Sequence, residues 1–485
     1  MSAGAPTSAA PPDPDHARPP TYHDRAEPAA GRRGGAPGAD ASPAAGNGAT
    51  PPPRVRQLVL KVHSRCNLAC DHCYVYRHAD QRWRERPRVI APGTVAQVAR
   101  RLGAHLARHR LDRVRVVLHG GEPLLAGTAV LDRTVRTLRA ALPPGAVLDV
   151  GVQTNGVLLD EGFLALCHRH DIDVGVSLDG DMAANDRHRR YPDGRGSFAD
   201  VAAALRLLAR PEHRSRWAGL LCTVDLANDP VRVYESLLAF APPRLDLLLP
   251  HGNWTAPPPG RRPGGTETPY GDWLVAVFDR WYPSTPRRTG IRLFESLIAL
   301  VLGGRSGTRA LGFAEPDIMT IETDGTIEGT DTLKTTDDAS MRTGLDVFRH
   351  SFDEALRHPS LAGRPTGAAA LADECRACPV LSACGGGLYA HRFRAGAGFA
   401  HPSVYCPDLY RLIRHVQRVV AADVDALRRR ALADASTGRA APDGPGPAGP
   451  ALPSDAGESA PAGHASPADG SVPLAQARRV APRWR

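Results

Sequence analysis

The sequence predicts an α/β protein, a partial (β/α)6 barrel of the TIM type followed by a cysteine-rich C-terminal domain, with disordered tails. Apolar runs of strand length alternate with longer stretches of helical period, which is typical of a parallel sheet with crossover helices. Seven of the nine cysteines fall in two groups, and such grouping favours metal or redox chemistry over structural disulfides. Both ends are rich in Ala, Pro and Gly, a composition that buries too little apolar surface to fold.

The composition excludes several classes of protein. Lys+Arg 60 against Asp+Glu 51 gives a net charge of +9, but almost every cation is arginine, and lysine occurs only at Lys61 and Lys334. No basic stripe with interleaved aromatic residues predicts a nucleic-acid surface. No apolar run of about 18 residues predicts a membrane span, and the N-terminus lacks a signal-peptide pattern. We therefore expect a cytoplasmic protein that binds neither nucleic acid nor membrane.

At roughly 100–200 residues per domain, 485 residues allow two to four domains. We expect the chain to divide where its composition and periodicity change. The expected parts are a disordered arm at 1–53, a barrel core at 54–260, a helical bridge at 261–310, a cysteine-rich domain at 311–428 and a disordered tail at 429–485.

Six buried strands are predicted from their apolar runs, at 55–63, 114–119, 147–153, 173–178, 217–224 and 245–250. Crossover helices are predicted where apolar residues recur with helical spacing, at 95–106, 131–138, 198–209 and 231–240. In the bridge, the large aromatic residues also follow helical spacing and predict packed core, with a peptide-binding groove as the alternative; they are Trp273, Phe278, Trp281 and Phe294.

Polar motifs follow the predicted strands, and in β/α barrels catalytic groups gather on these loops. Three cysteines follow the first strand. The loops after the second, third, fourth and sixth strands carry Gly120-Gly121-Glu122-Pro123, Gln153-Thr154-Asn155-Gly156, Ser177-Leu178-Asp179-Gly180 and His251-Gly252-Asn253-Trp254.

The first group of cysteines is Cys66, Cys70 and Cys73, in the pattern C-x3-C-x2-C. Three thiolates on one loop can ligate three irons of a cubane cluster and leave the fourth iron open for another ligand. The alternative is a zinc site whose fourth ligand is His63 or His72.

These motifs together resemble the radical S-adenosylmethionine (SAM) superfamily. The resemblance implies that the three cysteines hold a 4Fe-4S cluster that cleaves SAM to methionine and a 5′-deoxyadenosyl radical. It also implies a set of SAM contacts, which are Gly120, Gly121, Glu122, Gln153, Asn155, Ser177, Asp179 and Arg189. His72 stands where the family usually has an aromatic residue. Arg189 has a surface alternative, because Arg187 and Arg190 are its near neighbours.

The second group of cysteines is Cys375, Cys378 and Cys384, in the pattern C-x2-C-x5-C, with Cys406 downstream. Four thiolates complete one metal centre, and their spacing fits an iron-sulfur cluster and zinc equally well. The segment resembles the SPASM or twitch-type domain of radical SAM peptide maturases. Leu388 and Thr330 stand where the full SPASM pattern has cysteines. We therefore expect one auxiliary 4Fe-4S cluster, and two clusters in all.

Three further residues complete the inventory of candidates. Asp331 resembles an aspartate that acts as a base in sulfatase-maturing relatives, although Asp324-Gly325 also predicts that the surrounding segment is an acidic hairpin. Cys167 and Cys222 lie in apolar runs and are expected to be buried free thiols.

The segments KVHSRCNLACDHCYVY, LHGGEPLLAG, HGNW, CRACPVLSACGGG and HPSVYC resemble FxsB-type radical SAM/SPASM maturases. The resemblance implies a ribosomally made precursor peptide as substrate, cyclophane formation through a carbon-carbon cross-link, and an electron donor such as a flavodoxin or ferredoxin. The alternatives in the same class are formylglycine formation, thioether cross-linking and epimerisation. A zinc-bound structural scaffold is the alternative from a different class.

Overall fold

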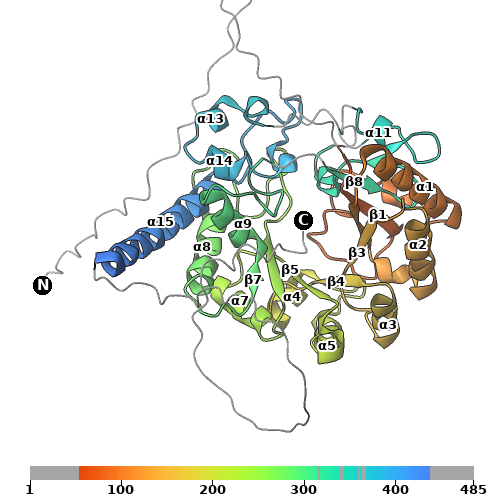
Figure 1. Ribbon diagram of the computed structural model, residues 1–485, viewed down its shortest axis with the longest axis horizontal. Helices are drawn as coiled ribbons and strands as arrows, with labels where there is room; N and C mark the ends of the chain where they lie inside the picture. The colour runs from red at the N-terminus through yellow and green to blue at the C-terminus, as the bar shows by residue number, and fades with distance from the viewer. Residues whose placement is uncertain (1–53, 314–316, 338–341, 359–360, 362–366, 437–485) are drawn as a thin grey trace, which may run out of the picture. The chain divides into compact units, whose positions relative to one another are not determined.

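The computed structural model describes residues 54–313, 317–337, 342–358, 361 and 367–436 (Figure 1). The predicted arm at 1–53 and the part of the predicted tail from 437 onward lie outside the described residues. The chain divides into two compact units, Met1–Gln417 and Arg418–Arg485. The first unit contains every described strand and all nine cysteines.

All six predicted strands are confirmed. They are β1 (Gln57–His63), β2 (Arg113–Gly120), β3 (Val147–Thr154), β4 (Ile172–Ser177), β5 (Trp217–Thr223) and β6 (Arg244–Leu248). Consecutive strands pair in parallel, so their carboxyl ends lie at the same edge of the sheet. The apolar centres of the strands are buried, as for Val116, Val150 and Val174. The loops that carry the sequence motifs therefore share one rim.

Helices connect these strands and confirm the predicted crossovers. They are α1 (Pro92–His109), α2 (Thr128–Ala140), α3 (Glu161–Arg169), α4 (Met182–His188), α5 (Phe198–Leu208), α6 (Pro211–Arg214) and α7 (Pro230–Leu238), with short 3-10 turns η1 (Arg82–Arg84) and η2 (Pro123–Ala126). The side chains of Asp160, Asp181 and Asp229 cap α3, α4 and α7 by accepting backbone N–H bonds. In Figure 1, α1, α2 and α3 line the outer side of the strands from β1 to β4.

The bridge consists of α8 (Pro269–Trp281), the short strand β7 (Gly290–Ile291) and α9 (Arg292–Val301). β7 adds a parallel strand beside β6. Trp273, Phe278, Trp281 and Phe294 are all at most 5% exposed, so they are core, and the alternative of an aromatic groove is wrong.

The predicted hairpin is confirmed as β8 (Ile318–Ile321) and β9 (Ile327–Glu328), an antiparallel pair. The strand with which this hairpin pairs was not predicted. β8 pairs in parallel with the free edge of β1, which gives the sheet order β7-β6-β5-β4-β3-β2-β1-β8-β9. The hairpin from the expected second domain therefore continues the sheet of the barrel, because β1 would otherwise leave backbone groups unpaired at this edge.

The rest of the cysteine-rich segment consists of short elements and one long helix. They are η3 (Asp331–Thr335), α11 (Phe352–Ala355), η4 (Ala368–Ala370), α13 (Asp373–Arg376), α14 (Leu381–Cys384), η5 (Tyr389–Arg392) and α15 (Cys406–Ser436). α15 continues past the predicted boundary at 428, which is a correction: the stretch 429–436 keeps good helix formers, and the helix ends only where the Pro/Gly-rich composition begins. Cys167 and Cys222 are buried, as predicted. No described helix is long and apolar enough to cross a membrane.

Candidate active site

The first cysteine group lies at the carboxyl end of β1. Cys66, Cys70 and Cys73 are half-buried free thiols. Burial, with the neighbouring charges of Glu122, Cys70 and Cys73, raises the pKa of Cys66 to about 12, against the opposing hydrogen bond from the backbone of Leu68. Burial also raises the pKa of Cys70 to about 11. The three thiols therefore act on one another electrostatically, and a metal centre bound to them must displace their protons.

The sulfur of Cys66 accepts two hydrogen bonds from protein. The backbone N–H of Leu68 lies 3.4 Å from Sγ, and Asn155 Nδ2 lies 3.7 Å from it. Asn155 also donates to Asn67 Oδ1 at 2.8 Å. The loop after β3 thus holds the cysteine loop in position, and Asn155 joins two of the predicted motifs.

Neither cysteine group has the compact spacing of a zinc site. With Zn–S bonds of about 2.3 Å, tetrahedral sulfur ligands lie about 3.8 Å apart. Within the described ranges, no three Cys, His, Asp or Glu ligand atoms that include a cysteine lie within 4.8 Å of one another. His63 accepts the backbone N–H of Arg65 through Nδ1, and His72 lies beside Asp179 at 3.6 Å.

Gly120 and Gly121 allow the end of β2 to pack on the cysteine loop. The N–H of Gly121 donates to His63 O and that of Glu122 to Arg65 O. A Cβ added at Gly120 would lie 2.2 Å from His63 O, and one at Gly121 would lie 1.7 Å from Tyr76 Oη. Glycine is required here by this close backbone approach.

Glu122 ties the second and third strand loops together. Its fully buried carboxylate accepts hydrogen bonds from Leu124 N, Thr154 Oγ1 and Asn155 N, at 2.7–2.9 Å. Burial raises its pKa to about 7, although the three hydrogen bonds favour the charged form. In this arrangement protein groups engage both carboxylate oxygens.

The remaining predicted SAM contacts form two pairs on the next loops. Gln153 Nε2 donates to Ser177 Oγ at 3.1 Å. Arg189 donates from Nε to Asp179 Oδ2 at 2.6 Å, and Asp179 also accepts Thr223 N. Burial opposes ionisation of Asp179, but the Arg189 charge holds its pKa below the usual value.

Arg189 is the inward arginine of its cluster. Its side chain is 12% exposed, whereas Arg187 and Arg190 are both exposed. Arg187 and Arg190 are therefore the solvent-exposed surface arginines, and Arg189 is not. The structure brings all eight predicted SAM-contact residues and the first cysteine group to one rim of the barrel.

The four cysteines of the second group converge from separate elements. Cys375 lies in α13, Cys384 ends α14, and Cys406 begins α15. Burial raises the pKa of Cys384 to about 11 and that of Cys406 further, and the charges of the other three thiols act on Cys406. The distant Cys406 therefore joins the other three in space, as its predicted role requires.

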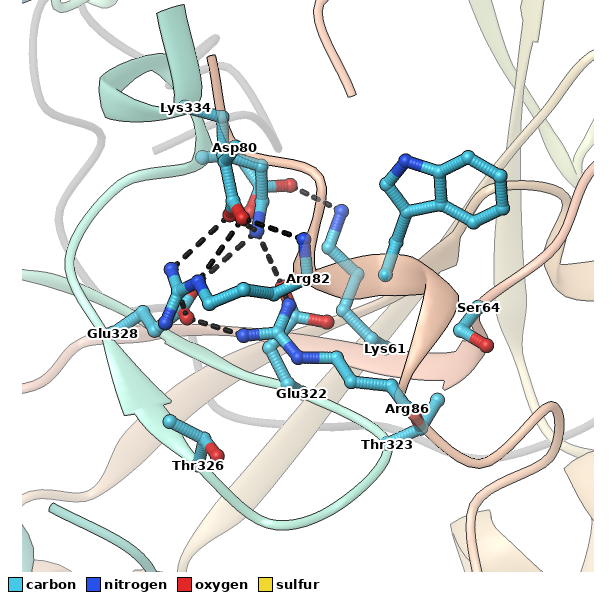
Figure 2. A network of polar contacts seen from close by, with 12 residues as sticks. Lys61, Ser64, Asp80, Arg82, Arg86, Glu322, Thr323, Thr326, Glu328 and Lys334 are labelled. Atoms are coloured by element: carbon cyan, nitrogen blue, oxygen red, sulfur yellow. Dashed lines mark hydrogen bonds and ion pairs between the residues drawn. The ribbon is translucent and has the colours of Figure 1, made fainter. Parts of the chain in front are cut away.

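A buried network of charges was missed by sequence analysis (Figure 2). It links the turn at η1 to the β8–β9 hairpin and η3. Lys334 Nζ lies 3.2 Å from Asp80, 2.7 Å from Glu322 and 3.1 Å from Glu328. Arg82 and Arg86 contact the same carboxylates.

Lys61 and Asp331 form a second ion pair beside this network. Lys61 Nζ also lies 3.2 Å from His119 Nδ1 and 3.4 Å from Gly120 O. Burial opposes ionisation of Asp331, but Lys61 and Lys334 lower its pKa to about 2. Asp331 is thus a buried carboxylate next to the Gly120-Gly121 loop. One signal pointed here: the two lysines of the chain are both in this cluster.

A small cavity lies between the network and the strand loops. Lys61, Glu322 and Lys334 line one part of it, and Ser64, Gly120 and Gly121 line another. The charged network and the predicted SAM-contact loop therefore face the same space.

The chain is similar in sequence and in fold to known proteins. Residues 60–211 match the Radical SAM superfamily. The chain is 23% identical over 384 residues to the serine-type anaerobic sulfatase-maturating enzyme of Bacteroides thetaiotaomicron, covering 74% of this chain and 88% of that protein. Native anSMEcpe with bound AdoMet matches with a TM-score of 0.65 at 19% identity, over 76% of this chain and 99% of that one.

The crystal structure of Streptococcus suis SuiB bound to precursor peptide SuiA matches with a TM-score of 0.50 at 15% identity, over 73% of this chain and 76% of that one. These structures share the partial barrel with this chain. Residues 60–211 are therefore a radical SAM domain, and the chain is a radical SAM enzyme homologous to the anaerobic sulfatase-maturating enzymes.

Proposed function

We propose that this enzyme is a maturase that oxidatively modifies a ribosomally made precursor peptide. The observation that carries the proposal is the convergence of Cys66, Cys70 and Cys73 with the Gly120-Gly121-Glu122 loop at one rim of a radical SAM domain. The similar enzymes support the substrate class, because they are named as sulfatase-maturating, and SuiB was crystallised with a precursor peptide.

Cys66, Cys70 and Cys73 would hold a 4Fe-4S cluster, and the loops after β2, β3 and β4 would hold SAM. Three free thiols on one loop leave the fourth iron of such a cluster open to SAM. Bound together, cluster and SAM supply hydrogen-atom abstraction. Gln153, Ser177, Asp179 and Arg189 would orient the SAM polar groups, and they are already held in hydrogen-bonded pairs.

Cys375, Cys378, Cys384 and Cys406 would hold one auxiliary 4Fe-4S cluster, which supplies electron transfer. Neither Thr330 nor Leu388 offers a thiolate for a further cluster, because neither residue is a cysteine. Thr330 Oγ1 is hydrogen-bonded with Thr332 Oγ1, and Leu388 directly precedes η5. An external donor such as a flavodoxin or ferredoxin would deliver electrons.

Asp331 would accept the proton that the oxidised substrate loses. Lys61 keeps this carboxylate ionised, so that it has a free lone pair to accept a proton. We expect Asp331→Asn to retain SAM cleavage and to lose most of the peptide product.

The specific reaction that we propose is a cyclophane cross-link. A side-chain β-carbon loses one hydrogen atom and bonds to an aromatic ring carbon; that ring carbon then loses a proton and an electron. The balance is loss of two hydrogens and formation of one carbon-carbon bond. Formylglycine formation is the second candidate, favoured by the similarity to sulfatase-maturating enzymes.

The first test is anaerobic formation of 5′-deoxyadenosine from SAM and dithionite by the iron-loaded protein. We expect product from the wild type and from Cys167→Ala, which alters a buried thiol outside both groups and away from the predicted SAM contacts, and none from Cys70→Ala. Equal activity of Cys70→Ala would overturn the proposal.

Mass spectrometry of a precursor peptide co-expressed with the enzyme separates the candidate reactions. A cross-link and an aldehyde made from serine both remove two hydrogens. Only the aldehyde reacts with a hydrazine probe, and only the cross-link suppresses backbone fragments between the joined residues. A hydrazine adduct would replace the cyclophane assignment by formylglycine formation.

A further inference from the structure

A buried arginine lies beside the second cysteine group. Arg392 ends η5 and is 7% exposed. Its guanidinium donates to three consecutive carbonyls. Nη2 donates to Gly385 O at 2.8 Å and to Gly387 O at 3.0 Å, and Nε donates to Gly386 O at 2.9 Å. The turn directly follows Cys384, so this charge is held next to a proposed cluster ligand.

The three glycines make this arrangement possible. Gly385, Gly386 and Gly387 have φ of +61°, +79° and +69°, which L side chains rarely adopt. A Cβ at Gly386 would also lie 2.9 Å from the guanidinium carbon of Arg392. The left-handed turn therefore points successive carbonyls at one cation.

Carbonyl groups solvate the guanidinium but do not neutralise it. Three other buried or half-buried arginines among the described residues face carboxylates: Arg86 faces Glu322, Arg189 faces Asp179, and Arg261 lies 3.4 Å from Asp408. In the part of the chain that the structure describes, Cys375, Cys384 and Tyr389 act on Arg392 electrostatically, and Arg392 acts on His391; no carboxylate is among these groups. A buried charge without a counter-charge is costly.

We propose that Arg392 is the buried counter-charge of the second cysteine group and raises the reduction potential of the cluster held there. Four thiolates around a 4Fe-4S core carry net negative charge, which one-electron reduction increases by one unit. A fixed cation in a low-dielectric site stabilises the more negative, reduced state. Arg392 would thus make the auxiliary cluster a better electron acceptor. This inference rests on the auxiliary cluster of the proposed function.

The test is a redox titration of the auxiliary cluster followed by electron paramagnetic resonance. The full-length chain carries Cys66→Ala, Cys70→Ala and Cys73→Ala, so that only the second group can hold a cluster. We expect Arg392→Gln to shift the midpoint potential downward and Arg392→Lys, which retains the charge, to shift it less.

Arg376→Gln is the matched control. It removes the same charge beside Cys375, but Arg376 is 46% exposed and paired with Asp373, so water and its partner screen it. We expect no shift. If Arg392→Gln and Arg376→Gln have the same midpoint potential at full iron content, the role of Arg392 is overturned, and the proposed auxiliary cluster is not.

A second measurement covers the case in which Arg392→Gln loads iron poorly. The gain in the free energy of unfolding on metal loading is compared for wild type, Arg392→Lys and Arg392→Gln. The counter-charge role predicts that the Gln variant, which lacks the charge, gains less stability from the metal than the Lys variant, which keeps it, although both lack the three-carbonyl fork. Equal gains in the two variants would overturn the inference. Absence of iron from the second group of the wild type would overturn both the auxiliary cluster and this role, while leaving SAM cleavage as a separate test.

Discussion

Single buried charges show how the rim of this barrel is organised. Lys61 and Asp331 have side chains that are 3% and 9% exposed, and each is the other's closest opposite charge. Such a pair contributes little net stability compared with apolar residues, but breaking it leaves one charge buried and unpaired. Position and ionisation of Asp331 therefore depend on Lys61.

We expect Asp331→Asn to reduce the free energy of unfolding by about 3–5 kcal/mol, because Lys61 is left without its partner. The double variant Lys61→Met, Asp331→Asn removes both charges and should recover most of that loss. Urea denaturation of the single and double variants measures the coupling. A double variant as unstable as the sum of the single ones would show that the two residues do not interact.

The pH dependence of stability is predicted at His105 in α1. The side chain is 1% exposed, and its Nε2 accepts the backbone N–H of Val55. Burial lowers its pKa from 6.5 to about 4, with Asp353 opposing and the charges of His109 and Arg108 contributing. The unfolded chain therefore takes up this proton first as the pH falls.

His105 should thus cost no stability above pH 6.5, and should reduce stability as the pH falls from 6.5 to 4, by about 1.4 kcal/mol per pH unit. His105→Gln keeps an acceptor for Val55 but cannot be protonated. Denaturation at pH 7, 6 and 5 gives the slope of the free energy of unfolding against pH. In this variant the slope should be smaller by the equivalent of about one proton. An unchanged slope would place the titration elsewhere.

Among the structural elements, the β8–β9 hairpin joins the cysteine-rich segment to the sheet beside the first cysteine group. β8 extends the sheet at β1, which leads into the first group, and η3 after β9 carries Asp331 and Lys334. The turn depends on Gly325, which has φ of +90° and packs against Phe348, Val347 and Thr94. A change in this turn should therefore disturb the buried network.

We expect Gly325→Ala to lower the free energy of unfolding by at least about 1–2 kcal/mol, because of the left-handed backbone and the added clash. Gly93→Ala is the control: it lies in α1 with nothing within 4 Å of the new Cβ, and should be neutral or stabilising by up to about 1 kcal/mol. Thermal unfolding of both variants compares them. Equal effects would mean that the turn at Gly325 is not strained.

For the whole molecule, the two cysteine groups predict a metal content. Anaerobically loaded protein should bind about eight iron atoms per chain, as two 4Fe-4S clusters, and about four after Cys66, Cys70 and Cys73 are replaced by Ala. Iron and zinc analysis measures this directly. Stoichiometric zinc in place of iron would support the structural scaffold instead.

Much of the fold could be predicted because it is encoded locally. Strand positions follow from apolar runs, crossover helices from helical periodicity, and the hairpin from Asp324-Gly325. The first cysteine group and the Gly120-Gly121-Glu122 loop were also recognisable, since each motif is short and contiguous. The role of Arg189 stays a prediction, and only its burial, which the sequence does not encode locally, distinguishes it from Arg187 and Arg190.

Other features depend on contacts between distant segments, which local patterns do not encode. Pairing of β8 with β1 joins residues more than two hundred positions apart, and the Lys334 network draws on Asp80 as well as on the hairpin. The solvation of Arg392 by carbonyls, without a carboxylate, depends equally on which groups are buried around it. The sequence alone indicates which side chains can carry the chemistry. Chain packing sets their partners and charges, because burial and long-range pairing arise only when the whole sheet assembles.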